Sequence, residues 1–193
     1  MKYKIVAIIG KAGAGKDSIL NILFDKKIAN DNCFKIVSCT SRPPREGEID
    51  GINYHFLTAD DFTQQVLNGE MIEATIFRDW CYGTSFRNLD KNKINIGVYN
   101  PEGVELIAGN NDIDTLIIYI VAPDKVRLIR QLNREENPDV KEIIRRYSTD
   151  ENDFSLVEEN FSPIIINNDD GANLEDIASK VWAHIVDWAK LDK

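Results

Sequence analysis

The stretch YKIVAIIGKAGAGKDSIL, residues 3–20, decides the fold of this 193-residue chain. Its first seven residues, YKIVAII, form a nearly continuous apolar run, which is typical of a parallel strand buried on both faces. The glycine-rich segment GKAGAGK follows, and apolar residues at helical spacing come after it. A turn of this kind points backbone N–H groups at phosphate oxygens, and the N-terminus of the next helix adds positive potential. The stretch therefore predicts a phosphate-binding loop.

By itself the loop predicts a site for a nucleoside triphosphate, with Lys16 as the point charge that meets the β and γ phosphates. It does not distinguish a kinase from a GTPase or a motor. The guanine-reading run Asn-Lys-x-Asp of GTPases is missing, because the segment NKIN at residues 92–95 lacks the Asp. A glycine-rich turn with a chance lysine is the alternative interpretation, which the combination of strand, spacing and helix disfavours.

One position of the loop departs from the usual pattern. The residue after the lysine is normally Ser or Thr, whose hydroxyl helps to hold the magnesium ion of a bound nucleotide. Here that residue is Asp17, and Ser18 follows it. Which side chain helps to hold the magnesium ion here is therefore a separate question.

Composition and charge restrict the class of protein. Charged residues make up 28% of the chain and hydrophobic residues 43%, as in ordinary globular domains. The formal charge of −9 argues against a nucleic-acid partner, and no apolar run approaches the roughly eighteen residues of a membrane span. The N-terminus lacks a signal-peptide pattern, and the three cysteines form no CxxC pair. We expect a cytoplasmic protein with reduced thiols, no nucleic-acid or membrane partner, and an undetermined oligomeric state.

Strands alternate with helices on both sides of a middle region. Apolar runs predict further core strands at residues 34–39, 93–99, 115–123 and 162–171. Because such alternation implies a mainly parallel sheet covered on both sides, the sequence predicts an α/β fold with three layers, α/β/α, around a five-stranded sheet.

Helix signals lie between these strands. A segment with Pro first and Gly last predicts a short helix at residues 101–109. Further helices are expected at residues 124–132 and from residue 141 onward. In the C-terminal segment, apolar residues from Leu174 to Trp188 fall on one helical face.

The middle region, residues 38–86, has the character of a small separate lobe. Prolines, glycines and charges at residues 40–51 predict a loop. A short strand, INYHFL, comes next, and Thr58 with Asp61 resembles the start of a helix that ends near Gly69. The segments MIEATIF and CYGTSF predict the two arms of a hairpin.

The stretch VSCTSRPPREGEIDGINYHF, residues 37–56, together with the loop, resembles the guanylate kinase family. That family carries Ser-x-Thr-x-Arg-x-Pro-Arg-x-Gly-Glu followed by Gly-x-x-Tyr-x-Phe. The segments MIEATIF, CYGTS and IINNDD extend the resemblance over nearly the whole chain. The matching positions of the long motif are Ser38, Thr40, Arg42, Pro44, Arg45, Gly47, Glu48, Gly51, Tyr54 and Phe56.

The resemblance implies a P-loop NTPase fold and a place in purine nucleotide metabolism. The implied reaction moves the γ-phosphoryl group of ATP, with Mg²⁺, to GMP or dGMP, giving ADP and GDP or dGDP. It also implies an organisation into a core (residues 1–37, 87–129 and 148–193), a lobe that binds the nucleoside monophosphate (38–86) and a helical lid (130–147).

The chemistry of the acceptor suits the residues that the resemblance assigns to it. Guanidinium forks and hydroxyls hold a phosphate dianion. A carboxylate, Glu73, accepts from the N1–H and the amine of guanine, and the Thr84 hydroxyl donates to O6. Adenine would present the reverse polarity and leave buried groups unmatched. The GMP site is thus predicted to contain Ser38, Arg42, Arg45, Tyr54, Glu73, Tyr82, Gly83, Thr84 and Asn100.

The resemblance assigns a second set of residues to ATP and to phosphoryl transfer. Cationic clamps stabilise the charge that develops on the transferred group. No general base is needed, because the acceptor phosphate is already ionised near neutral pH. The expected catalytic residues are Lys16, Arg42, Arg130, Arg134 and Arg146. The expected ATP contacts are Gly10, Lys11, Ala12, Gly13, Ala14, Gly15, Lys16, Asp17, Ser18 and Asn168.

The end of the segment INIGVYN is a second departure from the family pattern. The family usually has acidic residues where this chain has Val98 and Asn100, with Glu102 slightly beyond. One hypothesis is that Asp17 compensates by contributing a carboxylate to the magnesium shell, while the Asn100 carbonyl still meets the guanine amine. The alternative is that Asp17 only caps its helix and repels the γ-phosphate.

Two other functions stay open at this point. The chain could phosphorylate another (deoxy)nucleoside monophosphate or a phosphorylated sugar, because Asn100 weakens the guanine assignment. It could also be a non-catalytic guanylate-kinase-like module that binds phosphorylated peptides. Such modules typically degrade the phosphate loop, whereas Lys16 and the loop glycines are intact here.

Overall fold

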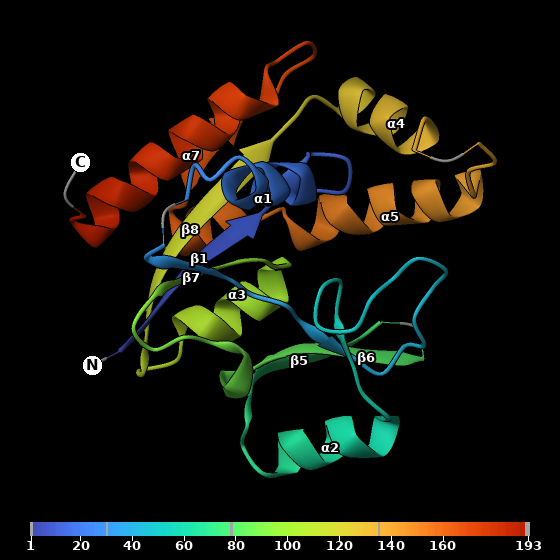
Figure 1. Ribbon diagram of the computed structural model, residues 1–193. Helices are drawn as coiled ribbons and strands as arrows, with labels where there is room; N and C mark the ends of the chain where they lie inside the picture. Colours follow the sequence, from blue (N-terminus) through green and yellow to red (C-terminus); the bar gives the residue numbers. More distant parts are fainter. Residues whose placement is uncertain (1, 30, 78, 135, 192–193) are drawn as a thin grey trace.

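A parallel sheet forms the centre of the molecule in the computed structural model, which describes residues 2–29, 31–77, 79–134 and 136–191 (Figure 1). The strand order β2-β7-β1-β8-β9 places the strand before the phosphate loop in the middle. All four pairings are parallel, so the predicted five-stranded sheet is confirmed. The strands are β1 (Tyr3–Ile9), β2 (Cys33–Lys35), β7 (Ile94–Val98), β8 (Ile113–Val121) and β9 (Ile164–Asn167).

Helices cover both faces of this sheet and complete the predicted three layers (Figure 1). On one face α1 (Lys16–Asp25) and α7 (Leu174–Ala189) pack side by side. On the other face lie α3 (Pro101–Ala108), α5 (Val140–Asp153) and the short α6 (Val157–Phe161).

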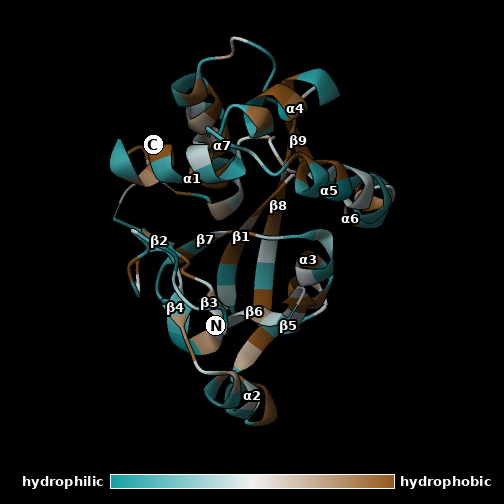
Figure 2. Cartoon of the chain, turned by 90° about the vertical axis from the view of Figure 1, so that its right-hand side faces the viewer, coloured by the Kyte–Doolittle hydropathy of each residue, from teal (hydrophilic) through white to brown (hydrophobic). Residues whose placement is uncertain are grey.

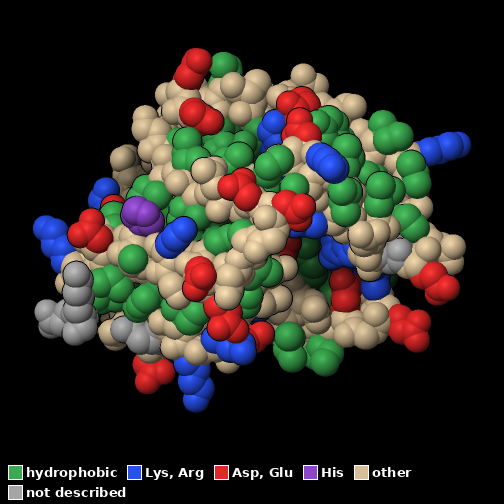
Figure 3. Space-filling model, turned by 90° about the horizontal axis from the view of Figure 1, so that it is seen from above, with side chains coloured by type: hydrophobic (Ala, Val, Ile, Leu, Met, Phe, Trp, Pro, Cys, Tyr) green, Lys and Arg blue, Asp and Glu red, His purple; other side chains and the backbone are tan. Residues whose placement is uncertain are grey.

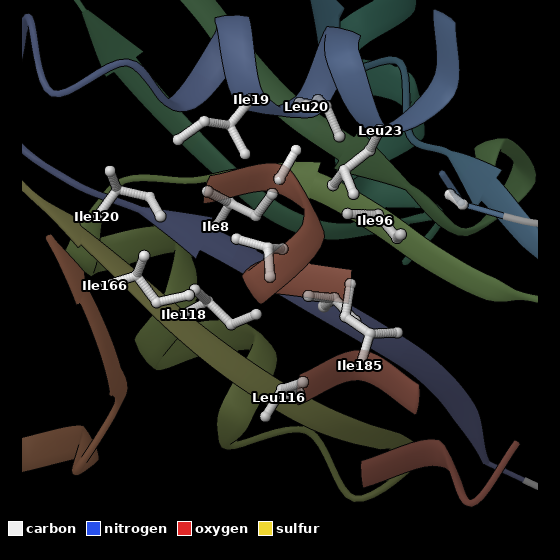
Figure 4. Close-up of a cluster of buried hydrophobic side chains, with 14 of the residues drawn as sticks. Ile8, Ile19, Leu20, Leu23, Ile96, Leu116, Ile118, Ile120, Ile166 and Ile185 are labelled. Carbon is white, nitrogen blue, oxygen red and sulfur yellow. The ribbon is translucent and has the colours of Figure 1, made fainter. Parts of the chain in front are cut away.

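Side-chain alternation along β1 explains its continuous apolar run. Successive residues of a strand point to opposite faces of the sheet. Val6 and Ile8 therefore enter the core beneath α1 and α7, whereas Ala7 and Ile9 enter the core beneath α3. Figure 4 shows Ile8 in the first of these cores, between the side chains of α1 and α7. Hydrophobic residues follow β1 and β8 through the centre of the molecule in Figure 2.

A second, mixed sheet forms the lobe, in the order β4-β3-β6-β5. Its β5 and β6 are antiparallel and form the predicted hairpin. The helix α2 (Ala59–Leu67) packs beside this hairpin, and a 3₁₀ turn at Phe86–Asn88 leads back to the core. The four strands are β3 (Cys39–Thr40), β4 (His55–Phe56), β5 (Met71–Phe77) and β6 (Trp80–Ser85).

The strand predicted at residues 34–39 is wrong as one continuous element. The chain pairs with β7 only as far as Lys35, and it joins the second sheet at Cys39, which pairs with Gly83. Between these points the Ser38 carbonyl accepts from His55 N at 2.8 Å. One apolar run thus serves two sheets, because its partners change from β7 to the strands of the lobe.

Helix ends follow the predicted signals closely. Thr58 Oγ1 accepts from Asp61 N at 3.0 Å and caps α2, and Gly69, with φ of 69°, lies just beyond the end of that helix. The helix α4 (Asp124–Leu132) has the predicted bounds, and α5 begins one residue before the expected start. Side chains cap the starts of α2, α3, α5 and α7 and satisfy N–H groups that have no partner within the helix.

Two simple expectations can be compared with the structure. All three cysteines, Cys33, Cys39 and Cys81, are free. In the described part of the chain, none of the helices has both the length and the apolar character needed to cross a membrane.

Candidate active site

A cleft of about 800 Å³ lies between the carboxyl ends of the central strands, the lobe and α5. Parallel α/β sheets usually bind their ligands at this edge. Figure 3 shows basic and acidic side chains gathered around a hollow in the surface. The predicted site residues that line the cleft are Gly10, Ala12, Lys16, Asp17, Ser38, Arg42, Arg45, Tyr54, Glu73, Tyr82, Gly83, Asn100, Arg134 and Arg146.

The phosphate loop, residues 10–16, requires glycine for two reasons. Gly13 and Gly15 have φ of 80° and 96°, a region that residues with a Cβ rarely adopt. A Cβ on Gly13 would lie 2.5 Å from the carbonyl oxygen of Arg127, and one on Gly15 would lie 2.5 Å from Asn168 Nδ2. The loop is therefore packed tightly from behind.

Lys16 begins α1, and its side chain folds back over the loop. Its Nζ donates to the carbonyl oxygen of Gly10 at 2.6 Å. Burial lowers the pKa of Lys16, while the nearby carboxylates of Asp17 and Asp150 oppose that shift. The ammonium thus stands inside the curve of the loop, where the phosphates of a nucleotide would meet it.

Carboxylates of α5 occupy the outer part of the loop. Ala12 N donates to Asp150 Oδ2 at 2.6 Å, and Lys11 Nζ pairs with Glu151 Oε1 at 2.7 Å. Burial raises the pKa of Asp150, although the bond from Ala12 opposes this. One of the backbone N–H groups that should face a phosphate already binds an anion of this chain.

Arg127 on α4 is a buried organiser of this region that sequence reasoning did not identify as a site residue. Its side chain is 1% exposed, and Nη2 pairs with Asp124 at 2.7 Å and with Glu151 at 3.2 Å. The guanidinium also lies 4.8 Å from the ring centre of Tyr147. Asp124 and Arg127 are three residues apart in the sequence, and such i, i+3 pairs are usually exposed. The spacing therefore did not indicate that Arg127 is buried.

Arg130 and Asn168 lie behind the loop. The Arg130 guanidinium donates to the carbonyl oxygens of Gly13 at 3.5 Å and of Asp169 at 3.2 Å. Asn168 is fully buried, and its Nδ2 donates to the Ala14 carbonyl at 2.8 Å. Neither side chain lines the cleft. A transfer role for Arg130 and an ATP contact for Asn168 therefore remain predictions.

The other predicted residues of the donor side are spread over the lid and α1. Arg134 lies exposed after α4, and Arg146 on α5 donates from Nε to Glu142 at 2.8 Å. Ser18 is exposed on α1 and does not line the cleft. The predicted lid thus spans the end of α4, residues 133–139 and the first half of α5. The domain limits stay a prediction.

On the lobe side, Glu48 holds the side chain of Arg42 and the backbone of Arg45. Arg42 is 8% exposed, and its Nη2 donates to Glu48 Oε1 at 2.9 Å. The other Glu48 oxygen accepts from Arg45 N at 2.7 Å. The Arg42 guanidinium also lies 5.6 Å from the ring centre of Tyr54. Glu48 belongs to the motif, but its role in orienting the Arg42 side chain was not predicted.

Hydroxyl groups surround the arginines in the cleft. Ser38 is half-buried at the crossing from the core to the lobe. Tyr54 and Tyr82 meet edge to face with ring centres 6.0 Å apart. Burial raises the pKa of the Tyr54 phenol, and the neighbouring Tyr82 and Asp17 add to that shift. The phenol stays neutral and is a donor suited to an anion.

Glu73 and Thr84 are partners across the hairpin, one on β5 and one on β6. Glu73 is 8% exposed, and Thr84 is fully buried beside it. Burial raises the pKa of Glu73 to about 7; the Thr84 hydroxyl lowers it, and the charge of Glu102 raises it further. Thr84 Oγ1 nevertheless makes no hydrogen bond of ordinary geometry in the described part of the chain. Only Glu73 of the pair reaches the cleft lining.

Asn100 and Val98 lie where the family usually has acids. Asn100 Oδ1 accepts from Gly103 N at 2.8 Å and so caps α3, although the side chain still borders the cleft. Val98 is half-buried in the cleft wall. Glu102 accepts from Thr75 Oγ1 at 3.1 Å and lines a smaller neighbouring hollow. Glu102 is therefore not placed to replace the missing strand acid in the cleft.

Asp17 lies in the first turn of α1, exposed and at the cleft wall. The N-cap of α1 is Gly15, which has no side-chain cap bond, so Asp17 is not the N-cap residue. Among the described residues, no three His, Cys, Asp or Glu side chains group to hold a metal ion. A metal at this cleft would need ligands from a bound triphosphate, as Mg²⁺ commonly does.

Comparisons with known proteins agree with this geometry. The family model described as guanylate kinase matches residues 2–185. A guanylate kinase of Onion yellows phytoplasma is 30% identical over 179 residues, which cover 91% of this chain and 82% of that protein. The guanylate kinase of Schizosaccharomyces pombe is 30% identical over 178 residues, which cover 88% of this chain and 85% of that protein.

A solved structure shares the fold. The crystal structure of guanylate kinase from Anaplasma phagocytophilum matches with a TM-score of 0.65 at 21% identity, covering 100% of this chain and 88% of that chain. Because the family model spans nearly the whole sequence, the chain belongs to the guanylate kinase family.

Proposed function

We propose that this protein transfers the γ-phosphoryl group of ATP to GMP or dGMP and releases ADP with GDP or dGDP. One observation carries the proposal: a single cleft is lined both by the phosphate loop with Lys16 and by the buried carboxyl of Glu73 with the arginines of the lobe. The loop alone suits any triphosphate, and the lobe alone suits any nucleoside monophosphate. Their shared cleft favours a transfer between the two.

Positioning and charge do the chemical work in this proposal. Arg42, whose guanidinium Glu48 orients, and Arg45 hold the acceptor phosphate, and Tyr54 adds a hydroxyl. A phosphate oxygen of GMP attacks the γ-phosphorus while the bond to the β–γ bridging oxygen breaks and ADP leaves. Lys16 with Arg134 and Arg146 then balances the charge on the transferred group. Mg²⁺, when bound with ATP, would neutralise charge on the β and γ oxygens.

Base recognition follows from the polarity of the hairpin pair. Ionised Glu73, which lines the cleft, accepts from the N1–H and the amine of guanine, and the hydroxyl of its cross-strand partner Thr84 would donate to O6 once a bound base reaches it. Adenine has a bare N1 and a 6-amino group, so it would leave a buried carboxylate and a hydroxyl without partners. This mismatch favours guanine over adenine.

A substrate panel tests the proposal. ADP release would be measured with ATP and Mg²⁺ against GMP, dGMP, IMP, AMP, CMP and UMP. We expect kcat/KM for GMP to exceed that for AMP, CMP and UMP by at least about tenfold. A preference for another acceptor would point to the alternative kinase. A flat panel with measurable GMP binding would point to a non-catalytic module. We propose the cytoplasm as its location, where free thiols such as those of Cys33, Cys39 and Cys81 stay reduced.

The role of Asp17 needs its own test. We propose that its carboxylate joins the magnesium shell in place of the acid missing at Val98. Asp17→Asn should then shift the Mg²⁺ requirement several-fold upward, on the scale of one lost charged ligand. Glu102→Gln is the matched control, because it removes an acid close to the missing strand position that lies outside the cleft. An unchanged rate and metal requirement in Asp17→Asn would contradict the proposal.

A further inference from the structure

Arg127 is a buried arginine that packs directly behind the phosphate loop. It lies on α4, and its side chain is only 1% exposed. Its backbone supports the loop, because a Cβ on Gly13 would lie 2.5 Å from the Arg127 carbonyl oxygen. A charge in such a place is costly unless other groups pair with it. Arg127 does not line the cleft, so any effect of its charge on a nucleotide must pass through other residues.

Three carboxylates from α4 and α5 surround the guanidinium. Nη2 donates to Asp124 Oδ1 at 2.7 Å and to Glu151 Oε1 at 3.2 Å. Nη1 donates to Asp150 Oδ2 at 3.5 Å. The two helices run beside each other in Figure 1, and Arg127 is the buried cation between them.

Two of these carboxylates hold the phosphate loop with the same oxygen that faces Arg127. Asp150 Oδ2 accepts from Ala12 N at 2.6 Å, and Glu151 Oε1 pairs with Lys11 Nζ at 2.7 Å. Each of these oxygens is thus shared between the loop and the guanidinium. For Asp150 the contact with the loop is the shorter one, so the loop is its main partner in the ligand-free protein.

A bound triphosphate would take this partner away. Backbone N–H groups of such a loop bind phosphate oxygens, so a phosphate at the Ala12 N–H displaces Asp150. Because α5 fixes its backbone, the displaced carboxylate stays near the phosphate, and two anions in a partly buried site repel each other. Asp150 then needs a cation that is not itself bound to the phosphate. Arg127 can take this role, because its buried Nε has no hydrogen-bond partner in the described part of the chain.

We propose that Arg127 is a positioning residue for ATP: its guanidinium neutralises and retains the Asp150 carboxylate when a phosphate takes the Ala12 N–H in its place. The exchange moves one hydrogen bond of Asp150 from the loop to Arg127 and breaks no covalent bond. This inference rests on the proposed function, since it concerns the side of the cleft that binds ATP. It identifies which residue lets a loop with an internal anion accept a triphosphate.

Removing the guanidinium tests the proposal, with a non-hydrolysable ATP analogue as the probe. We expect Arg127→Met to weaken binding of the analogue by about tenfold, because Asp150 then faces the phosphate without a counter-charge. In steady-state assays KM for ATP should rise by about the same factor, while kcat stays within about threefold and KM for GMP within about twofold. Lys125→Met is the matched control, because it removes an exposed positive charge from the same helix, and it should leave these values unchanged.

A double-mutant cycle separates this role from a purely structural one. In an Asp150→Asn background the carboxylate is absent, so adding Arg127→Met should weaken analogue binding by about twofold or less. Arg127→Lys keeps a positive charge without the guanidinium fork, and we expect a loss of about threefold. Thermal unfolding of each variant establishes that it is folded. If Arg127→Met does not fold, Arg127→Lys with and without Asp150→Asn gives the same comparison.

An unchanged affinity for the analogue in the folded Arg127 variant would overturn the inference. An equal loss in the Asp150→Asn background, or an equal loss of GMP binding, would also overturn it. These outcomes would leave the proposed reaction intact. A wild-type protein that binds the analogue but transfers no phosphoryl group to GMP would instead overturn the proposed function, while the binding comparison would still decide the role of Arg127.

Discussion

The two sides of the cleft differ in how their polar groups are satisfied. On the phosphate-loop side, Ala12 N–H already binds Asp150, and Lys16 already donates to the Gly10 carbonyl. On the lobe side, the hydroxyls of Thr84 and Tyr99 have no partners among the described residues, and Glu73 is buried with a raised pKa. The triphosphate must therefore displace contacts that the chain makes with itself, whereas the base supplies contacts that the chain lacks.

This difference separates affinity from selectivity. Replacing an internal carboxylate by a phosphate exchanges one charged hydrogen bond for another and gives a modest net gain. Filling buried groups that have no partner rewards only a ligand with matching polarity. The loop side is thus expected to set how much ATP is needed, and the lobe side to set which base is accepted.

The largest effect on activity should come from removing the positive charge of Lys16 in the loop. Lys16→Met is expected to lower kcat by on the order of 10³, because a preorganised cation facing the transferred group is lost. Binding of GMP alone, measured by calorimetry, should stay within about twofold, since Lys16 belongs to the other side. Lys26→Met is the control, because Lys26 follows α1 outside the loop and makes an exposed pair with Glu175. A kcat loss of the same size in both variants would contradict a specific role for Lys16.

Removing the negative charge of Glu73 in the lobe should have the next largest effect. Glu73→Gln is expected to lower kcat/KM for GMP by on the order of 10², because the amide presents a donor where guanine also donates. The KM for ATP should stay unchanged. If kcat/KM for AMP falls by the same factor as that for GMP, Glu73 does not read the base.

The internal contact of the loop side can be broken directly. Asp150→Ala should raise ATP affinity by about tenfold, since the Ala12 N–H then has no competing carboxylate and charged hydrogen bonds contribute roughly 1.5–3 kcal/mol. Asp153→Ala is the matched control: it removes another cleft carboxylate of α5. Fluorescent ATP-analogue titration would measure both variants. An unchanged or weaker affinity in Asp150→Ala would show that this contact does not compete with nucleotide.

The pH dependence of base binding should show the smallest effect. Because burial raises the pKa of Glu73 to about 7, the accepting carboxylate forms only as the pH rises through that value. GMP affinity relative to AMP affinity should thus rise several-fold between about pH 6 and pH 8. The ratio cancels the ionisation of the phosphate that both nucleotides share. Glu73→Gln should give a flat ratio, and a flat ratio in the unaltered protein would contradict the assignment.

The same ionisation has the opposite sign for the stability of the ligand-free protein. The folded state binds the Glu73 proton more tightly than the unfolded chain, whose pKa is near 4.5. Below the pKa of the unfolded chain, this proton contributes fully to the free energy of unfolding. The contribution, on the order of 3 kcal/mol, is lost as the pH rises through about 7. Comparing thermal unfolding of the protein and of Glu73→Gln at both ends of that range checks the sign.

Local sequence signals predicted most of the fold because they depend on short-range physics. Turn glycines, caps such as Thr58, and strand periodicity located the loop, β1 and α2. The long motif assigned Arg42 and Glu73 to one site, and the cleft brings them together. These features require no knowledge of distant contacts.

The remaining features depend on contacts between distant segments. The run at residues 34–39 is divided because its partners lie on β7 and on β6. Arg127 is buried because acids from α5 surround it. Arg130 faces the back of the loop, because carbonyls near Asp169 hold it there. No local pattern specifies these partners.

The contact between Ala12 and Asp150 has a consequence for the concentration of ATP at which the site fills. Asp150 is a ligand tethered to the loop, and α5 fixes its effective concentration. Any change that loosens α5 lowers that concentration without altering the loop. The cap at Asp139, whose carboxylate accepts from Glu142 N at 3.1 Å, lies at the far end of the same helix. The ATP concentration needed to fill the site therefore depends on how well ordered α5 is, even at the end of this helix that lies far from the loop.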